Sequence, residues 1–182
     1  MAVVSFARRL TDLATADPSR AAITCGETSL TRCELEAAAD AFARQLLDDG
    51  VNQGEMVTIA LPNSVDWFVG VVATWKIGAI PQLVSSMLPP RELAAIVDLA
   101  NPRVVLGTDP AAFADRICRP IGYVAPAAAP DAEPLPDAIS PAWKAPTSGG
   151  STGRPKLIVS GQPSSMDDEV PPTLLIQPDG CM

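Results

Sequence analysis

The chain has 182 residues, of which 47% are hydrophobic, 19% charged and 4% aromatic, and its 13 Lys and Arg against 21 Asp and Glu give a formal net charge of −8. This length indicates one domain, or one and a part, with room for a proper core. The acidic balance argues against binding to nucleic acid or to anionic membranes, because both need clustered Lys and Arg. The apolar content argues against disorder.

The chain has no histidine, and its four cysteines lack metal-ligand spacing. These absences argue against a zinc site and against histidine-based triads, and we expect reduced thiols in a cytoplasmic protein. The most apolar stretch, residues 65–81, is interrupted by Asp66 and Lys76. It predicts a buried helix and no membrane span, and we see no secretory signal at the N-terminus.

The first fifty residues predict a helix, a hairpin and a second helix. Apolar residues recur at helical spacing from Phe6 and stop at Asp17-Pro18, and two short β-runs then flank Gly26-Glu27. Thr31 and Glu34 match a capping box, in which the hydroxyl accepts the backbone N–H of Glu34 and the carboxylate reaches back. The helix that follows is expected to end at Gly50.

The next segment alternates strands with helices. Strands are expected at residues 56–61, 80–84 and 103–107, and helices at 65–77, 90–100 and 109–118. This order predicts an α/β fold with a mainly parallel sheet and helices on both faces. A stripe at helical spacing is interpreted as core packing, with part of it available for docking; it comprises Trp67, Phe68, Val71, Val72 and Trp75.

Proline and alanine dominate the segment from Pro120 to Pro146, which predicts an extended connector with one edge strand near residues 121–124. We therefore divide the chain into an α/β N-terminal subdomain (1–124), a Pro/Ala-rich connector (125–142), a phosphate-loop hairpin (143–161) and a Pro-rich tail (162–182). The tail would begin a second subdomain that this chain lacks.

Three glycines, four hydroxyls and two cations occur together in ten positions, Thr147 to Lys156. Glycines let successive backbone N–H groups turn toward one concavity, hydroxyls donate to phosphate oxygens, and lysine supplies a compact cation. The pattern predicts a polyphosphate cradle. It is not a Walker A motif, because Arg154-Pro155 separates Gly153 from Lys156 and the following residues are strand-like. We expect the loop to join a strand at 143–145 to one at 157–160.

Composition alone leaves other interpretations open. One alternative is a plain α/β scaffold whose flexible Gly/Ser loop binds no ligand. The chain can also be a non-catalytic module that binds phosphate or a nucleotide. Stabilisation by Mg·ATP or pyrophosphate would separate a binder from a scaffold.

The order of residue types resembles the phosphate-binding signature of the adenylate-forming superfamily, which includes AMP-forming acyl-CoA synthetases, luciferases and peptide-synthetase adenylation domains. The family run Ser/Thr-Gly-Ser/Thr-Thr-Gly-x-Pro-Lys is matched, with one additional Gly, by Ser148-Gly149-Gly150-Ser151-Thr152-Gly153-Arg154-Pro155-Lys156. Family members also share the Thr-x-x-Glu-Leu helix start, a Leu-Pro-Asn-Ser turn and a Gly-Ala-Ile turn, here at Thr31–Leu35, Leu61–Ser64 and Gly78–Ile80.

The resemblance implies that a carboxylate attacks the α-phosphate of ATP, giving an acyl-adenylate and pyrophosphate, and that a thiol, usually CoA, then captures the acyl group. It implies that the loop residues hold the β- and γ-phosphates with Mg²⁺; these are Thr147, Ser148, Gly149, Gly150, Ser151, Thr152 and Gly153. Lys156 would offset charge on pyrophosphate. The double-Gly loop favours an acid–CoA ligase over luciferases and amino-acid-activating domains.

Family enzymes are far longer, and the adenine pocket, the acyl tunnel and a catalytic lysine lie in parts that have no counterpart here. The chain is therefore interpreted as an N-terminal piece of such an enzyme, with no catalytic residue and no metal ligand of its own. It is expected not to adenylate anything alone, and apolar surface left uncovered would favour self-association.

Overall fold

The predicted α/β architecture is confirmed in the computed structural model, which describes residues 3–129, 131–148 and 155–168. Its centre is a parallel four-stranded sheet in the order β5-β4-β6-β7. The strands are β4 (Met56–Ile59), β5 (Ile80–Leu83), β6 (Val104–Leu106) and β7 (Ile117–Arg119). In the register, Val57 lies opposite Pro81 on one side and Val104 on the other.

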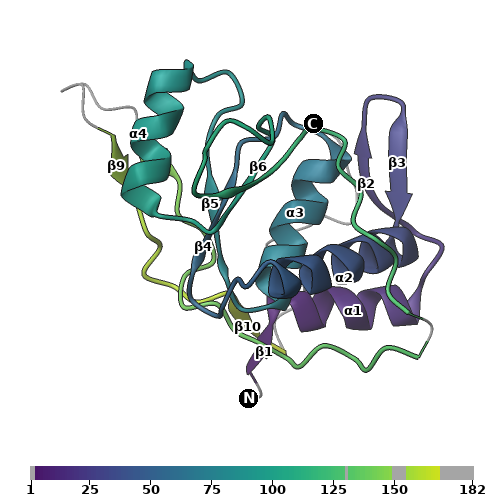
Figure 1. The fold of residues 1–182 in the computed structure, drawn as a ribbon. Coiled ribbons are helices and arrows are strands. Elements are labelled where there is room, and N and C mark those ends of the chain that lie inside the picture. Colours follow the sequence, from purple (N-terminus) through teal and green to yellow (C-terminus); the bar gives the residue numbers. More distant parts are fainter. Residues whose placement is uncertain (1–2, 130, 149–154, 169–182) are drawn as a thin grey trace.

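Helices cover both faces of this sheet (Figure 1). They are α1 (Phe6–Ala16), α2 (Arg32–Asp48), α3 (Val65–Lys76) and α4 (Pro90–Ala100). Helices α2 and α3 pack on one face and α4 on the other, while α1 lies outside against α2 and α3. Parallel strands joined through helices on opposite faces bury both faces of the sheet.

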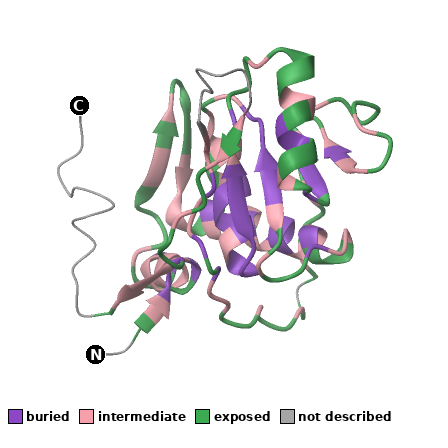
Figure 2. Ribbon diagram, turned by 90° about the vertical axis from the view of Figure 1, so that its left-hand side faces the viewer, coloured by how far each residue is buried: buried purple, intermediate pink, exposed green. Residues whose placement is uncertain are grey.

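Alternation along the strands divides the core between the two faces. Val57, Ile59, Val104 and Leu106 point toward α2 and α3, and all are at most 1% exposed. The alternate residue Val105 packs against α4. Figure 2 shows the buried strands at the centre of the molecule. The buried strands are mostly apolar, and the buried polar residues Thr58 and Gln82 are hydrogen-bonded to each other at 2.7 Å.

The helix starts follow the predicted signals. The capping box at α2 is confirmed: Thr31 Oγ1 accepts the N–H of Glu34 at 3.2 Å, and the N–H of Thr31 donates to the Glu34 carboxylate at 2.8 Å. These contacts lower the pKa of Glu34, chiefly through the backbone N–H of Thr31. Ser64 caps α3 by accepting the N–H of Trp67 at 3.3 Å.

The aromatic stripe of α3 is mostly core, as interpreted. Val71 and Val72 are buried, and Trp67 and Trp75 are partly buried against the main cluster. Phe68 is 42% exposed and packs edge-on against Trp67.

Two predictions between residues 103 and 124 are wrong. Residues 109–116 form turns instead of a helix, because Asp109 accepts the N–H of Ala111 at 2.8 Å and closes a local turn. The edge strand lies at Ile117–Arg119 and not at 121–124. There Cys118 packs into the core on the α4 side of the sheet. Pro120 and Gly122 then turn the chain away from the sheet, and Gly122 has a φ of +77°.

Besides the phosphate-loop hairpin, which is described below, two ribbons and an extended segment complete the fold. Strands β2 (Ala21–Cys25) and β3 (Thr28–Thr31) form the predicted hairpin, and β1 (Val3–Ser5) pairs antiparallel with β10 (Ser165–Asp167). The described residues of 120–146 contain neither helix nor strand. This segment contacts the helical layer: the Arg44 guanidinium donates to the carbonyl of Glu133 at 2.6 Å.

Candidate functional site

The predicted loop does join two antiparallel strands. They are β8 (Thr147–Ser148) and β9 (Lys156–Leu157), with Thr147 opposite Leu157 and Ser148 opposite Lys156. Backbone hydrogen bonds between the same two segments continue away from the loop, from Ile158 to Pro146, from Ser160 to Lys144 and from Trp143 to Gln162. The paired strands are therefore at 147–148 and 156–157, while the expected segments 143–145 and 157–160 lie along the same ladder.

The turn of the hairpin lies outside the described residues. It contains the predicted site residues Gly149, Gly150, Ser151, Thr152 and Gly153, and Arg154. The structure places the remaining three, Thr147, Ser148 and Lys156, at the point where the two strands enter and leave that turn.

The hairpin is attached to the edge of the sheet beside β5. The N–H of Ala145 donates to the carbonyl of Pro81 at 2.9 Å. Ala142 and Ala145 are 2% and 0% exposed and pack against Ile80. On the other strand, β9 contacts α4, as Figure 1 shows. Small residues at these positions let the hairpin backbone approach the sheet closely.

A tryptophan of α3 holds the start of the hairpin. The indole N–H of Trp75 donates to the carbonyl of Trp143 at 2.9 Å, and Phe6 packs edge-on against the Trp75 ring, with centroids 5.3 Å apart. Sequence reasoning assigned Trp75 to the core and missed this contact, because its partner is 68 residues away.

Two lysines lie on the hairpin in different surroundings. Lys156 is exposed and makes no ion pair with any described residue. The ammonium of Lys144 lies 4.0 Å from the centre of the Trp143 ring, which is a cation–π contact. The cation at the loop exit is thus available for an anionic ligand.

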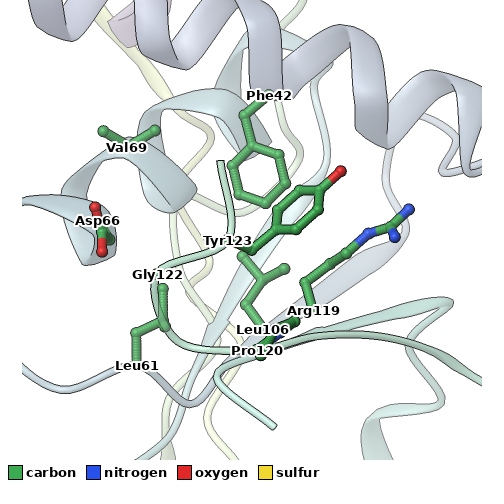
Figure 3. Close-up of a pocket in the computed structure, with 9 residues that line it drawn as sticks. All are labelled: Phe42, Leu61, Asp66, Val69, Leu106, Arg119, Pro120, Gly122 and Tyr123. Atoms are coloured by element: carbon green, nitrogen blue, oxygen red, sulfur yellow. The ribbon is translucent and has the colours of Figure 1, made fainter. Parts of the chain in front are cut away.

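A small pocket opens between the sheet and helices α2 and α3, at the carboxyl ends of β4 and β6 (Figure 3). Its lining includes Phe42, Leu106, Arg119 and Tyr123, and its volume is about 30 Å³. The Arg119 guanidinium lies over the Tyr123 ring at 4.8 Å and pairs with Asp49 at 2.7 Å. A cavity of this size holds one or two waters, so the pocket is far too small for a nucleotide.

Among the residues that the structure describes, no group of three or more His, Cys, Asp or Glu is placed to hold a metal ion. Cys25, Cys33 and Cys118 are free thiols. Among the described helices, none combines the length and apolar character needed to cross a bilayer.

Curated relatives are found among peptide-type synthetases. Surfactin synthase subunit 2 of Bacillus subtilis is 33% identical over 148 residues, which cover 78% of this chain and 4% of that protein. Pseudomonine synthase PmsE of Pseudomonas entomophila is 30% identical over 170 residues, covering 79% of this chain and 28% of that protein. The chain thus spans less than a third of the length of these two relatives.

Solved structures share the fold. o-Succinylbenzoate CoA synthetase (MenE) from Bacillus subtilis, in complex with the acyl-adenylate intermediate OSB-AMP, matches with a TM-score of 0.69 at 20% identity, over 87% of this chain and 42% of that one. The NpsA N-terminal subdomain of Klebsiella oxytoca, in complex with 3-hydroxybenzoyl-AMSN, matches with a TM-score of 0.67 at 21% identity, over 86% and 40%.

The family model described as AMP-binding enzyme matches residues 10–166, which include the whole hairpin. Together with the shared fold, this match shows that the chain belongs to the AMP-binding, adenylate-forming enzyme family.

Proposed function

We propose that this chain supplies the ATP phosphate-binding part of an enzyme that activates a carboxylic acid as an acyl-adenylate. The observation that carries the proposal is the hairpin geometry. It places the hydroxyl-bearing residue Ser148 opposite the exposed Lys156, where both strands meet the glycine-rich turn. A cation and hydroxyls that surround a run of glycines suit a polyphosphate.

In the proposed reaction, a carboxylate oxygen bonds to the α-phosphorus of ATP. The bond from that phosphorus to the bridging oxygen breaks, and pyrophosphate leaves with the electron pair. A thiol then adds to the acyl carbonyl, loses its proton and displaces AMP. In-line displacement at phosphorus depends mainly on positioning and charge neutralisation, so no histidine base is needed for the first step.

Each loop residue has a role in this proposal. The hydroxyls of Thr147, Ser148, Ser151 and Thr152 donate to β- and γ-phosphate oxygens, the amides of Gly149, Gly150 and Gly153 face the same anion, and Lys156 offsets charge on the departing pyrophosphate. The donor set fits Mg²⁺ bound mainly through phosphate oxygens, since hydroxyls are hard oxygen ligands. When bound, Mg²⁺ neutralises part of the phosphate charge.

For the acceptor we propose CoA, which makes the enzyme an acid–CoA ligase in the cytoplasm. The double-Gly loop favours this choice, and the MenE match involves a protein named as a CoA synthetase. The second candidate is a peptide-synthetase activity, favoured by the names of surfactin synthase subunit 2 and of a nonribosomal peptide synthetase from Salinispora arenicola. Thioester formation with free CoA by a longer protein that contains this chain would separate the two.

Binding tests the proposal directly. Saturating Mg·ATP or Mg·pyrophosphate should raise the unfolding temperature of the wild-type chain, because a ligand at 100 times its Kd adds about 2.7 kcal/mol of stability. Lys156→Ala should remove most of this stabilisation. Lys144→Ala is the matched control, because it deletes a lysine whose ammonium already contacts the Trp143 ring.

The outcomes separate the candidate functions. Equal stabilisation of both variants would contradict the role of Lys156, and no stabilisation of the wild type would favour an inert scaffold. We expect this chain alone to form no acyl-adenylate in a single-turnover assay. Formation of acyl-AMP would show that the chain is an enzyme by itself. Self-association, also proposed, is tested by sedimentation across a range of concentrations.

A further inference from the structure

The two ends of the phosphate-loop hairpin are bound to each other through buried serines. The chain enters the hairpin after Ser140 and leaves it at Ser164, and both residues are 0% exposed. The N–H of Ser164 donates to the carbonyl of Ser140 at 2.9 Å, and the N–H of Ser140 donates to the Ser164 hydroxyl at 2.8 Å. The Ser140 hydroxyl donates to the carbonyl of Ala142 at 2.7 Å.

The exit of the hairpin is also tied to the start of α1. The N–H of Phe6 donates to the carbonyl of Ser164 at 2.9 Å, and Ser5 is paired with Ser165 in the β1–β10 ribbon. Ser5 is itself 0% exposed: its hydroxyl donates to Asp137 at 2.5 Å and accepts the N–H of Arg8 at 2.9 Å. The N-terminal strand therefore closes a ring that contains both ends of the hairpin.

Ser5 is the N-cap of α1, whereas packing alone does not account for serine at positions 140 and 164. A buried hydroxyl costs free energy unless it is hydrogen-bonded, and an apolar residue of similar size would avoid that cost. The Ser140 and Ser164 hydroxyls bond to backbone groups at the two ends of the hairpin, outside any helix or strand. The Ser5 hydroxyl bonds to the Asp137 carboxylate, in the segment before the hairpin, and caps the start of α1.

We propose that Ser5, Ser140 and Ser164 form a serine clamp that positions the described ends of the phosphate loop, Ser148 and Lys156, for the polyphosphate. This inference rests on the proposed function. Binding costs less free energy when the groups that contact the ligand are already held in position. The clamp removes part of that freedom before the ligand arrives, so the three serines are positioning residues and touch no substrate.

The test compares Ser164→Ala with Ser160→Ala. The first change leaves the buried N–H of Ser140 without its acceptor, whereas the Ser160 hydroxyl accepts only an exposed N–H, that of Gln162, at 3.2 Å two residues along the chain. Affinity for Mg·pyrophosphate is measured by titration calorimetry at a temperature where every variant is folded, and amide hydrogen exchange is followed in residues 143–148 and 156–162. Ser164→Ala should bind about tenfold more weakly and exchange faster in the hairpin, with exchange in the sheet unchanged.

The outcomes separate this inference from the proposed function. If the wild type binds and Ser164→Ala binds equally well, or its hairpin exchanges no faster, the clamp is overturned while the proposed function stands. A wild type that binds neither Mg·ATP nor Mg·pyrophosphate contradicts the proposed function and this role with it. If Ser164→Ala does not fold, Ser140→Ala provides the same comparison, because it removes one hydrogen bond and leaves no N–H unpaired.

Discussion

The parallel sheet and the phosphate-loop hairpin are both made of β-strands, yet different interactions stabilise them. In the sheet, Val104 and Leu106 are at most 1% exposed and pack against helices. In the hairpin, contact with the body includes backbone hydrogen bonds, the small side chains of Ala142 and Ala145 and the Trp75 indole. Apolar burial dominates folding free energy, whereas a few backbone hydrogen bonds permit local opening. The sheet therefore sets global stability, and the hairpin is expected to open locally at a lower free energy.

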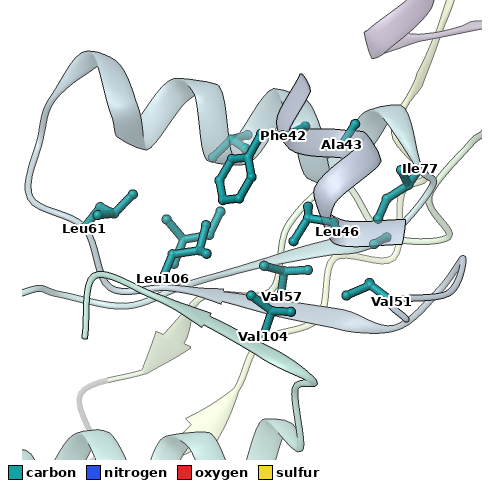
Figure 4. Close-up of a cluster of buried hydrophobic side chains, with 13 residues drawn as sticks. Phe42, Ala43, Leu46, Val51, Val57, Leu61, Ile77, Val104 and Leu106 are labelled. Atoms are coloured by element: carbon teal, nitrogen blue, oxygen red, sulfur yellow. The ribbon is translucent and has the colours of Figure 1, made fainter. Parts of the chain in front are cut away.

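The largest expected effect comes from the sheet side of this comparison. Leu46 is 0% exposed and lies in the main cluster between α2 and the sheet (Figure 4). Leu46→Ala should lower the free energy of unfolding by about 3–4 kcal/mol, through lost transfer energy and a cavity. Its neighbour Leu47 is 44% exposed, so Leu47→Ala should change stability by less than about 1 kcal/mol. Urea denaturation measures both, and equal losses would contradict the assigned core.

A glycine at the end of β6 gives the next largest effect. Gly107 has a φ of +87°, and a Cβ there would lie 2.4 Å from the carbonyl oxygen of Ala60, so Gly107→Ala must displace the backbone. We expect a loss of about 3 kcal/mol, more than the ~1–2 kcal/mol that a left-handed backbone alone costs. Gly122→Ala is the control, because Gly122 has a φ of +77° with no atom within 4 Å of the added Cβ. Denaturation curves that coincide for the two variants would show that the contact with Ala60 is unimportant.

The hairpin should respond locally and more weakly. Ala145 is 0% exposed against the sheet edge, and Ala145→Leu should cost about 1–3 kcal/mol by overpacking. Hydrogen exchange should increase in residues 143–148 and 156–162 and stay slow in β4 and β6. Val159 is 49% exposed, so Val159→Leu should leave both regions unchanged. Faster exchange throughout the sheet in Ala145→Leu would mean that the two regions unfold as one unit.

The sequence was sufficient for structure that depends on local pattern. Periodicity and cap residues predicted the four main helices and the capping box at Thr31. The alternation of strands with helices predicted the parallel sheet. Each of these signals lies within a short stretch of sequence. The segment at 109–118 failed because Asp109-Pro110 begins a turn as readily as a helix, and only the free sheet edge selects a strand at Ile117. The ion pair of Asp49 with Arg119 joins residues 70 positions apart, which no local pattern reports.

The candidate site divides in the same way. The residues of the candidate site could be identified from the sequence, because Thr147 and Lys156 flank a recognisable glycine-rich run. The pairing of β8 with β9 was expected, but the attachment of the hairpin was not. An alanine such as Ala145 carries no chemical signal of its own, and the buried state of Ser140 and Ser164 depends on a long-range ring of contacts.

The smallest expected effect concerns the start of α2, which is stabilised by the exposed capping box of Thr31 and Glu34. The Thr31 N–H lowers the pKa of Glu34 in the folded chain. Its contribution to stability is therefore present above the unfolded pKa of about 4.3 and is lost as the pH falls through the lower folded value. Glu34→Gln keeps the reach to Thr31 without a titrating group, so its unfolding midpoints in urea at pH 7 and pH 3 should differ less than those of the wild type. Glu34→Ala removes the contact at both pH values. A Glu34→Gln chain with the wild-type pH dependence would mean that the cap acts through its hydrogen bonds and not through the charge of Glu34.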